Sequence, residues 1–140
     1  MQTWQAMYAI IWIALLQILF ILFSPLGNGL NWPIHAVIAL AILGFAFRVN
    51  RGVRLTSCPD RIKRIARTTM LLALLQGVLG VALAIGIVLS WGAGYFTVVA
   101  FLHVANALAI ITQASSSATA FDMWEDKEFQ SPTPPAASPA

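Results

Sequence analysis

Residues 4–24 read WQAMYAIIWIALLQILFILFS and contain no charged side chain. At 1.5 Å per residue a helix of this length extends about 31 Å, which matches the roughly 30 Å of hydrocarbon in a bilayer. The stretch has neither the basic start nor the small-residue cleavage site of a secretion signal, so we expect it to be retained as a helix. Across all 140 residues, 59% are hydrophobic and 9% are charged, whereas soluble domains have about 25% charged residues.

Three further segments are long and apolar enough to cross the same distance, and they cover residues 31–48, 68–91 and 95–113. A turn-rich stretch, SPLGNG, follows the first segment, and Gly92-Ala93-Gly94 separates the last two. We expect the fourth helix to continue through about residue 118. The sequence therefore predicts an all-α, integral membrane up-down four-helix bundle within residues 1–121. Residues 122–140, which end in a Pro/Ala/Ser-rich run, are expected to form a disordered tail.

The charged residues are unevenly distributed along the chain. Seven of the eight basic residues lie between the second and third segments, namely Arg48, Arg51, Arg54, Arg61, Lys63, Arg64 and Arg67. Basic residues in a short loop beside membrane spans mark the cytoplasmic side, so we expect a plasma-membrane protein with both termini in the cytoplasm. This distribution indicates contact with membrane lipid and argues against nucleic-acid binding. The single cysteine, Cys58, excludes an intramolecular disulfide and a thiolate metal cluster.

The chain has two histidines, His35 in the second segment and His103 in the fourth. Both segments run in the same direction, and each histidine precedes the inner end of its segment by about 15–20 Å at 1.5 Å per residue. We therefore expect the two imidazoles at similar depth, in the outer half of the bundle. Two histidines on different helices can ligate a haem iron from both faces and leave it low-spin. The alternative for His35 is an interfacial position near the headgroups, and the alternative for His103 is an interhelical hydrogen bond to Gln76 or to the neighbours of Asn106.

Small and amide-bearing residues accompany these histidines. Gly77 and Gly80 belong to a small-residue face of the third segment, which permits close approach by another helix or by a flat ligand. Asn106 shares the His103 face of the fourth segment. Gln17 and Gln76 are predicted to form interhelical hydrogen bonds worth on the order of 1 kcal/mol each, with contact to a haem propionate or a quinone as the alternative for both.

The sequence lacks the residues needed for a carboxylate proton relay, phosphate binding, nucleophilic catalysis or zinc binding. Asp60 lies in the basic loop and every other acidic residue lies beyond residue 121, so no carboxylate relay crosses the predicted membrane region. The sequence has no phosphate-binding glycine loop, no Ser/His/Asp set and no Cys/His zinc pattern. No catalytic residue is predicted.

The runs LALLQGVLGV (residues 72–81) and AFLHVANA (residues 100–107) resemble the third and fourth helices of one half of a haem A synthase, and IHAVIAL (residues 34–40) resembles the second. That family consists of two four-helix halves, each with one histidine on its second helix and one on its fourth. The resemblance covers residues 7–113. It implies haem b as the cofactor, with His35 and His103 as axial ligands of the iron and Gln76, Gly77, Gly80 and Asn106 in the haem pocket.

Three positions depart from the catalytic half of that family. Trp32 stands where the family has a glutamate, Ala36 stands where it commonly has an arginine, and residues 25–31 lack its cysteine pair. The chain is closer to the non-catalytic half, which holds a haem b. The resemblance thus implies haem A biogenesis or electron transfer beside a terminal oxidase, with a second copy of the chain or respiratory oxidase subunits as partners. The alternative is a haem-free membrane subunit of a respiratory or transport complex.

Overall fold

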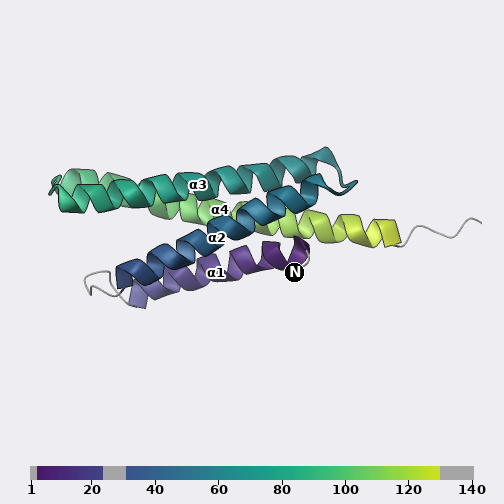
Figure 1. Ribbon diagram of the computed structural model, residues 1–140, viewed down its shortest axis with the longest axis horizontal. Coiled ribbons are helices and arrows are strands. Elements are labelled where there is room, and N and C mark those ends of the chain that lie inside the picture. The colour runs from purple at the N-terminus through teal and green to yellow at the C-terminus, as the bar shows by residue number, and fades with distance from the viewer. Residues whose placement is uncertain (1–2, 24–30, 130–140) are drawn as a thin grey trace, which may run out of the picture.

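The computed structural model describes residues 3–23 and 31–129, and this part of the chain is helical apart from two turns. Its four helices are α1 (Thr3–Phe23), α2 (Asn31–Arg54), α3 (Asp60–Val88) and α4 (Ala93–Phe129) (Figure 1). Each is long and apolar enough to cross a membrane. The predicted all-α, four-helix membrane bundle is therefore confirmed, while the predicted SPLGNG turn lies outside the described residues.

Three boundaries of α2 and α3 were predicted wrongly, because the prediction ended each helix with its apolar stretch. The structure continues α2 to Arg54 instead of residue 48 and starts α3 at Asp60 instead of residue 68. Arginine and lysine favour helix almost as strongly as leucine, so the helices continue through the basic region and only residues 55–59 connect them. At its other end α3 stops at Val88, three residues before the predicted limit.

The predicted disordered tail was wrong for residues 122–129, which continue α4 as a helix. Two aromatic side chains hold this extension: Phe121 is buried in the hydrophobic core, and Trp124 packs against that core. Asp122 accepts a hydrogen bond of 2.6 Å from the Tyr8 hydroxyl of α1. The extension therefore packs on the bundle through a few side chains. The acidic composition of residues 122–128 gives no indication of this packing. Residues 130–140 lie outside the described part.

The four helices pack in a ring, in which α1 contacts α2 and α4, and α3 contacts the same two helices. Consequently α2 and α4 lie diagonally across the bundle. We name its two ends by their turns, the α2–α3 end (residues 54–60) and the α3–α4 end (residues 88–93). Figure 1 shows the α1/α2 pair crossing the α3/α4 pair obliquely, with the pairs standing apart towards the α3–α4 end.

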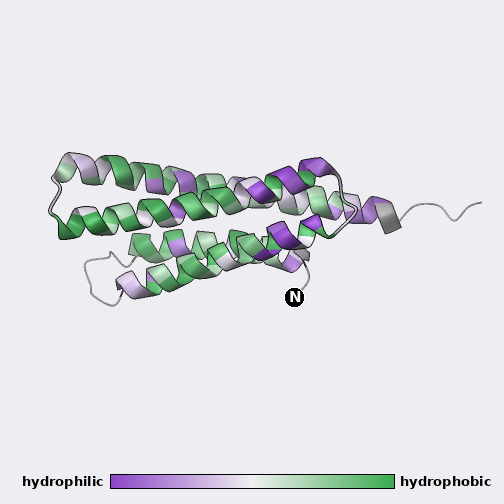
Figure 2. Ribbon diagram, turned by 45° about the horizontal axis from the view of Figure 1, so that its top comes forward, coloured by the Kyte–Doolittle hydropathy of each residue, from purple (hydrophilic) through white to green (hydrophobic). Residues whose placement is uncertain are grey.

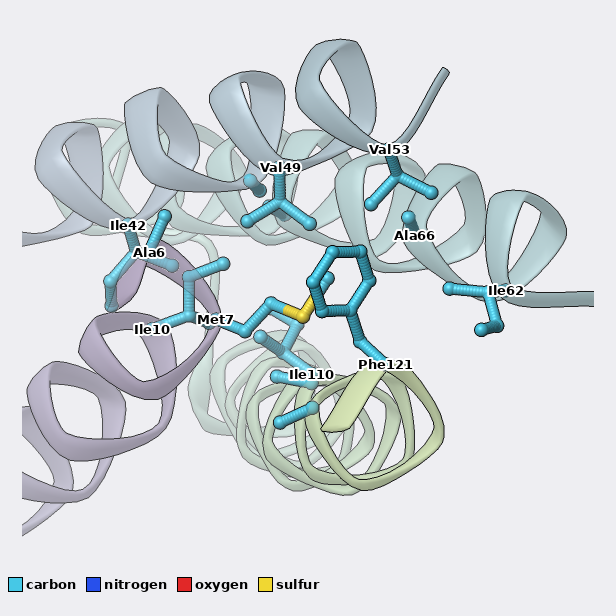
Figure 3. Close-up of a cluster of buried hydrophobic side chains, with 14 of the residues drawn as sticks. Ala6, Met7, Ile10, Ile42, Val49, Val53, Ile62, Ala66, Ile110 and Phe121 are labelled. Carbon is cyan, nitrogen blue, oxygen red and sulfur yellow. The ribbon is translucent and has the colours of Figure 1, made fainter. Parts of the chain in front are cut away.

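The hydrophobic core is concentrated towards the α2–α3 end. Buried apolar residues of α1 all precede residue 15, and those of α2 all follow residue 41. Figure 3 shows the side chains of Met7, Val49, Val53 and Phe121 converging there from three helices. The same end carries most of the hydrophilic residues in Figure 2. The core thus holds one end of the bundle closed and leaves the other half of α1 and α2 less tightly packed against α3 and α4.

At the α3–α4 end one tyrosine ties the two helices together. The Tyr95 ring packs so closely on Gly86 that a Cβ at this glycine would overlap the ring, and the Tyr95 hydroxyl donates a 2.9 Å hydrogen bond to the Ala82 carbonyl oxygen. Ser90 adopts a left-handed backbone conformation (φ 55°) in the turn. The turn therefore lies around Ser90, slightly earlier than the predicted Gly92-Ala93-Gly94, and α4 already begins at Ala93.

Candidate functional site

The structure brings the two histidines together. The ring centroids of His35 on α2 and His103 on α4 lie 6.1 Å apart, with 45° between the ring planes. Because α2 and α4 are the diagonal pair, the rings meet across the bundle, each half-buried. Each histidine precedes the first core residue of its helix, Ile42 on α2 or Ile110 on α4, so both lie towards the α3–α4 end. Figure 1 shows the helix pairs diverging towards that end. The shared level of the two histidines agrees with the depth expected from the sequence.

The separation of the rings suits a single metal ion between them. A metal–imidazole bond is about 2.0 Å long, so two rings on opposite sides of one ion have centres roughly 6 Å apart. The 45° angle is compatible with such an arrangement because each ring can rotate about its own metal–nitrogen bond. The described residues contain no cluster of three or more His, Cys, Asp or Glu that would complete a metal site made of side chains alone. Two imidazoles suffice when a porphyrin supplies the other four nitrogens.

Gln17 of α1 holds one of the two histidines. Its Nε2 lies 2.9 Å from His35 Nδ1 and donates a 3.0 Å hydrogen bond to the His35 carbonyl oxygen. The amide is buried, with 8% of its surface exposed. The predicted interhelical role of Gln17 is confirmed. The partner of Gln17 was not predicted, although the sequence contains a signal for it. Gln17 lies six residues before the end of α1, and His35 lies four residues after the start of α2. These positions place the two residues at similar depth.

Gln76 and Asn106 form the second amide contact of this region. Asn106 Nδ2 donates to Gln76 Oε1 at 2.7 Å and to the Leu72 carbonyl oxygen at 2.9 Å. This contact joins α3 to α4 and confirms the interhelical role predicted for Gln76. Asn106 follows His103 by three residues, so the pair lies within about one helical turn of the histidine. Their place in a haem pocket remains a prediction.

His103 has no partner comparable to Gln17. Its Nδ1 atom is buried and has no hydrogen-bond partner among the described residues. An unpaired buried polar atom lowers the stability of a fold by about 1–3 kcal/mol. Here that atom belongs to the ring that faces His35. The two imidazoles are therefore inequivalent, one held by an amide and the other held by packing alone.

The two glycines of the predicted small-residue face differ in their surroundings. A Cβ at Gly80 would lie 3.5 Å from His103 Cε1, so this glycine leaves room beside the ring. A Cβ at Gly77 would meet nothing within 4 Å, and Gly77 is exposed. The expectation that Gly77 permits close helix packing was wrong, because no neighbouring helix comes within 4 Å of a Cβ placed there. Gly80 is the one that contacts the site.

The other notable polar residues of the described chain lie elsewhere. Asn50 and Ser117 are buried near the α2–α3 end, where Asn50 Nδ2 donates to the Met70 sulfur at 3.3 Å. Cys58 is buried and its thiol lies 3.6 Å from the Val53 carbonyl oxygen. Trp32, at the position of the glutamate in the haem A synthase family, is 46% exposed. None of these side chains adds a ligand to the histidine pair.

Comparison of the chain with models of protein families, with curated proteins and with solved structures found no match. The functional argument therefore depends on the residues of the site. Its donor set is two imidazoles across the centre of an apolar bundle, with a glycine beside one ring and an amide on the other. This set fits the iron of a haem, since neutral imidazole is a common iron ligand and the bundle interior is apolar.

Proposed function

We propose that this chain is a membrane protein that binds one haem b, with His35 and His103 as the axial ligands. The observation that carries the proposal is the 6.1 Å separation of the two ring centroids across the bundle. No other pair of helices in the described chain carries two facing imidazoles, because the chain has only two histidines. Gly80 supports the proposal by leaving space beside the His103 ring.

A haem with two axial imidazoles supplies one-electron transfer and leaves no open coordination position for a substrate. The chain positions the two histidines. The core at the α2–α3 end fixes the relative position of α2 and α4, and thereby the distance between the ligands. Gln17 orients His35, and the Asn106–Gln76 contact holds α4 to α3 beside His103.

The cellular role that we propose follows the resemblance to one half of haem A synthase: haem A biogenesis, or electron transfer beside a terminal oxidase. Trp32 at the glutamate position and the lack of an intramembrane carboxylate favour electron transfer over oxidation of a haem substrate by this chain alone. A second copy of the chain or subunits of a respiratory oxidase are the proposed partners. A haem-free membrane subunit, in which the histidines only pack, is the competing function.

We further propose that the α2–α3 end faces the cytoplasm and that the protein lies in the plasma membrane. Arg51, Arg54, Arg61, Arg64 and Arg67 are all exposed at this end. Reporters fused at Cys58 and after Phe129 are therefore expected to be active only in their cytoplasmic form. A periplasmic signal at either position would reverse the orientation, and a reporter inserted at Gly92 serves as the control for the opposite side.

The test of the proposed function is the optical spectrum of the purified protein after haem b is supplied. A bis-histidine haem protein is red and gives sharp α and β bands on reduction. A colourless protein that takes up no haem leaves the packing subunit as the better account.

A further inference from the structure

Two arginines lie along the seam between α2 and α3, at the α2–α3 end of the bundle. Asn50 Nδ2 of α2 donates to the Met70 sulfur of α3 at 3.3 Å, so these two residues mark a place where the helices touch. Arg54 follows Asn50 by four residues and is its neighbour on α2. Arg67 precedes Met70 by three residues and is its neighbour on α3. Because the two helices are antiparallel, both arginines lie beside this contact on the side of the connecting turn.

The seam is strongly positive at this end. Arg51 lies three residues before Arg54 on α2. Arg64 lies three residues before Arg67 on α3, so each of the two seam arginines has a second arginine as its neighbour. All four are exposed, and within the described residues none of them forms a salt bridge. Asp60 is the only acidic residue in the sequence of these two helices, and its carboxylate pairs with a lysine of α3 at 3.6 Å. The four guanidinium groups are therefore available to an anion.

The seam continues away from the arginines as an exposed apolar surface. Phe47 lies four residues before Arg51 and is 59% exposed, and Leu71 lies four residues after Arg67 and is 49% exposed. Both belong to helices that are long and apolar enough to cross a membrane. An acidic protein segment in water would reach the arginines but not these two side chains, which face hydrocarbon. A phospholipid presents a phosphate and an acyl chain side by side, and so matches both parts of the seam.

We propose that the α2–α3 seam binds an anionic phospholipid, with the headgroup phosphate on Arg54 and Arg67 and an acyl chain along Phe47 and Leu71. A guanidinium group donates two parallel hydrogen bonds to a phosphate, which the ammonium group of lysine does not. Anionic lipids are enriched in the cytoplasmic leaflet, on the side where the proposed orientation places this end. The seam is separate from the histidine pair, so the inference does not depend on haem binding.

The experiment titrates the full-length, detergent-purified protein with phosphatidylglycerol, which is anionic, and in parallel with phosphatidylcholine, which is not. Native mass spectrometry measures the fraction of protein that carries one lipid. The wild type is expected to bind phosphatidylglycerol more tightly. One basic residue near an anionic headgroup contributes about 5-fold in affinity. Arg54→Gln and Arg67→Gln are therefore each expected to weaken the binding of phosphatidylglycerol about 5-fold, and to leave the binding of phosphatidylcholine unchanged.

Arg61→Gln is the matched control. It removes the same charge from an exposed position of α3, but Arg61 lies six residues before Arg67 and so points about 120° away around the helix axis. Its effect is expected to be smaller than that of either seam variant. Equal losses in Arg61→Gln and Arg67→Gln would show a diffuse attraction between charges and would overturn the seam as a site. A wild type that binds both lipids equally would overturn the lipid as the occupant and leave an acidic protein segment in its place.

Discussion

A His103→Ala protein is expected to lose the low-spin haem spectrum. Removing the imidazole leaves the iron with His35 alone, so the remaining haem becomes five-coordinate and high-spin, and most of it is lost during purification. His35→Ala is expected to give the same result from the other face. The measurement is haem content per chain together with the oxidised and reduced spectra of both variants beside the wild type.

Two controls separate loss of a ligand from loss of the fold. Imidazole added to His103→Ala is expected to occupy the vacated space and restore a six-coordinate, low-spin iron. His103→Met is expected to keep six-coordination and raise the reduction potential, since a thioether favours the reduced iron. Either alanine variant with as much low-spin haem as the parent would contradict the assignment of that histidine.

The second large effect is expected at Gly80. A Cβ there lies in ordinary contact with His103 Cε1 at 3.5 Å, so Gly80→Ala is expected to bind haem normally. Leucine adds three further carbons beside the ring, and overpacking of this kind costs about 1–3 kcal/mol. We therefore expect Gly80→Leu to weaken haem affinity about 10- to 100-fold. A titration of each purified variant with haem b measures the difference.

Gly77→Leu provides the matched control for Gly80→Leu. It makes the same change three residues earlier on α3, where a Cβ meets no atom within 4 Å. This variant is expected to fold and bind haem like the wild type. If Gly80→Leu also binds haem normally, the space beside His103 is not part of a haem pocket. If both leucine variants unfold, helix packing alone explains the glycines.

The fold could be predicted because lipid imposes one simple requirement, a helix of about 20 apolar residues for each crossing. The stretch of residues 4–24 meets it without a charge. The same requirement says nothing about where a helix ends outside the bilayer, and the predicted limits failed there. Arg54 and Asp60 belong to helices because the residues that interrupt the helix, which end in Pro59, lie between them. The extension to Phe129 depends on Phe121 and Trp124, whose packing on the hydrophobic core is a tertiary effect.

The candidate site could be predicted only in part. The shared level of His35 and His103 follows from depth, which is a linear function of residue number along straight helices. The direction in which a side chain points around its helix axis is not fixed by depth, and it decides which side chains contact each other. Gln17 points at His35, whereas Gln76 points at Asn106. Gly80 faces His103 while Gly77, less than one turn away, does not. These differences depend on how the helix pairs cross, which the apolar sequence does not specify.

The most direct test of the central claim is a titration of the ligand-free, detergent-purified protein with haem b, followed through the low-spin iron signal. Two imidazoles of one chain on one iron predict saturation at one haem per chain, with the low-spin form present from the first addition. Saturation at one haem per two chains would contradict the assignment of both ligands to one chain. A titration that produces no low-spin iron would contradict the account altogether and leave His35 and His103 as packing residues.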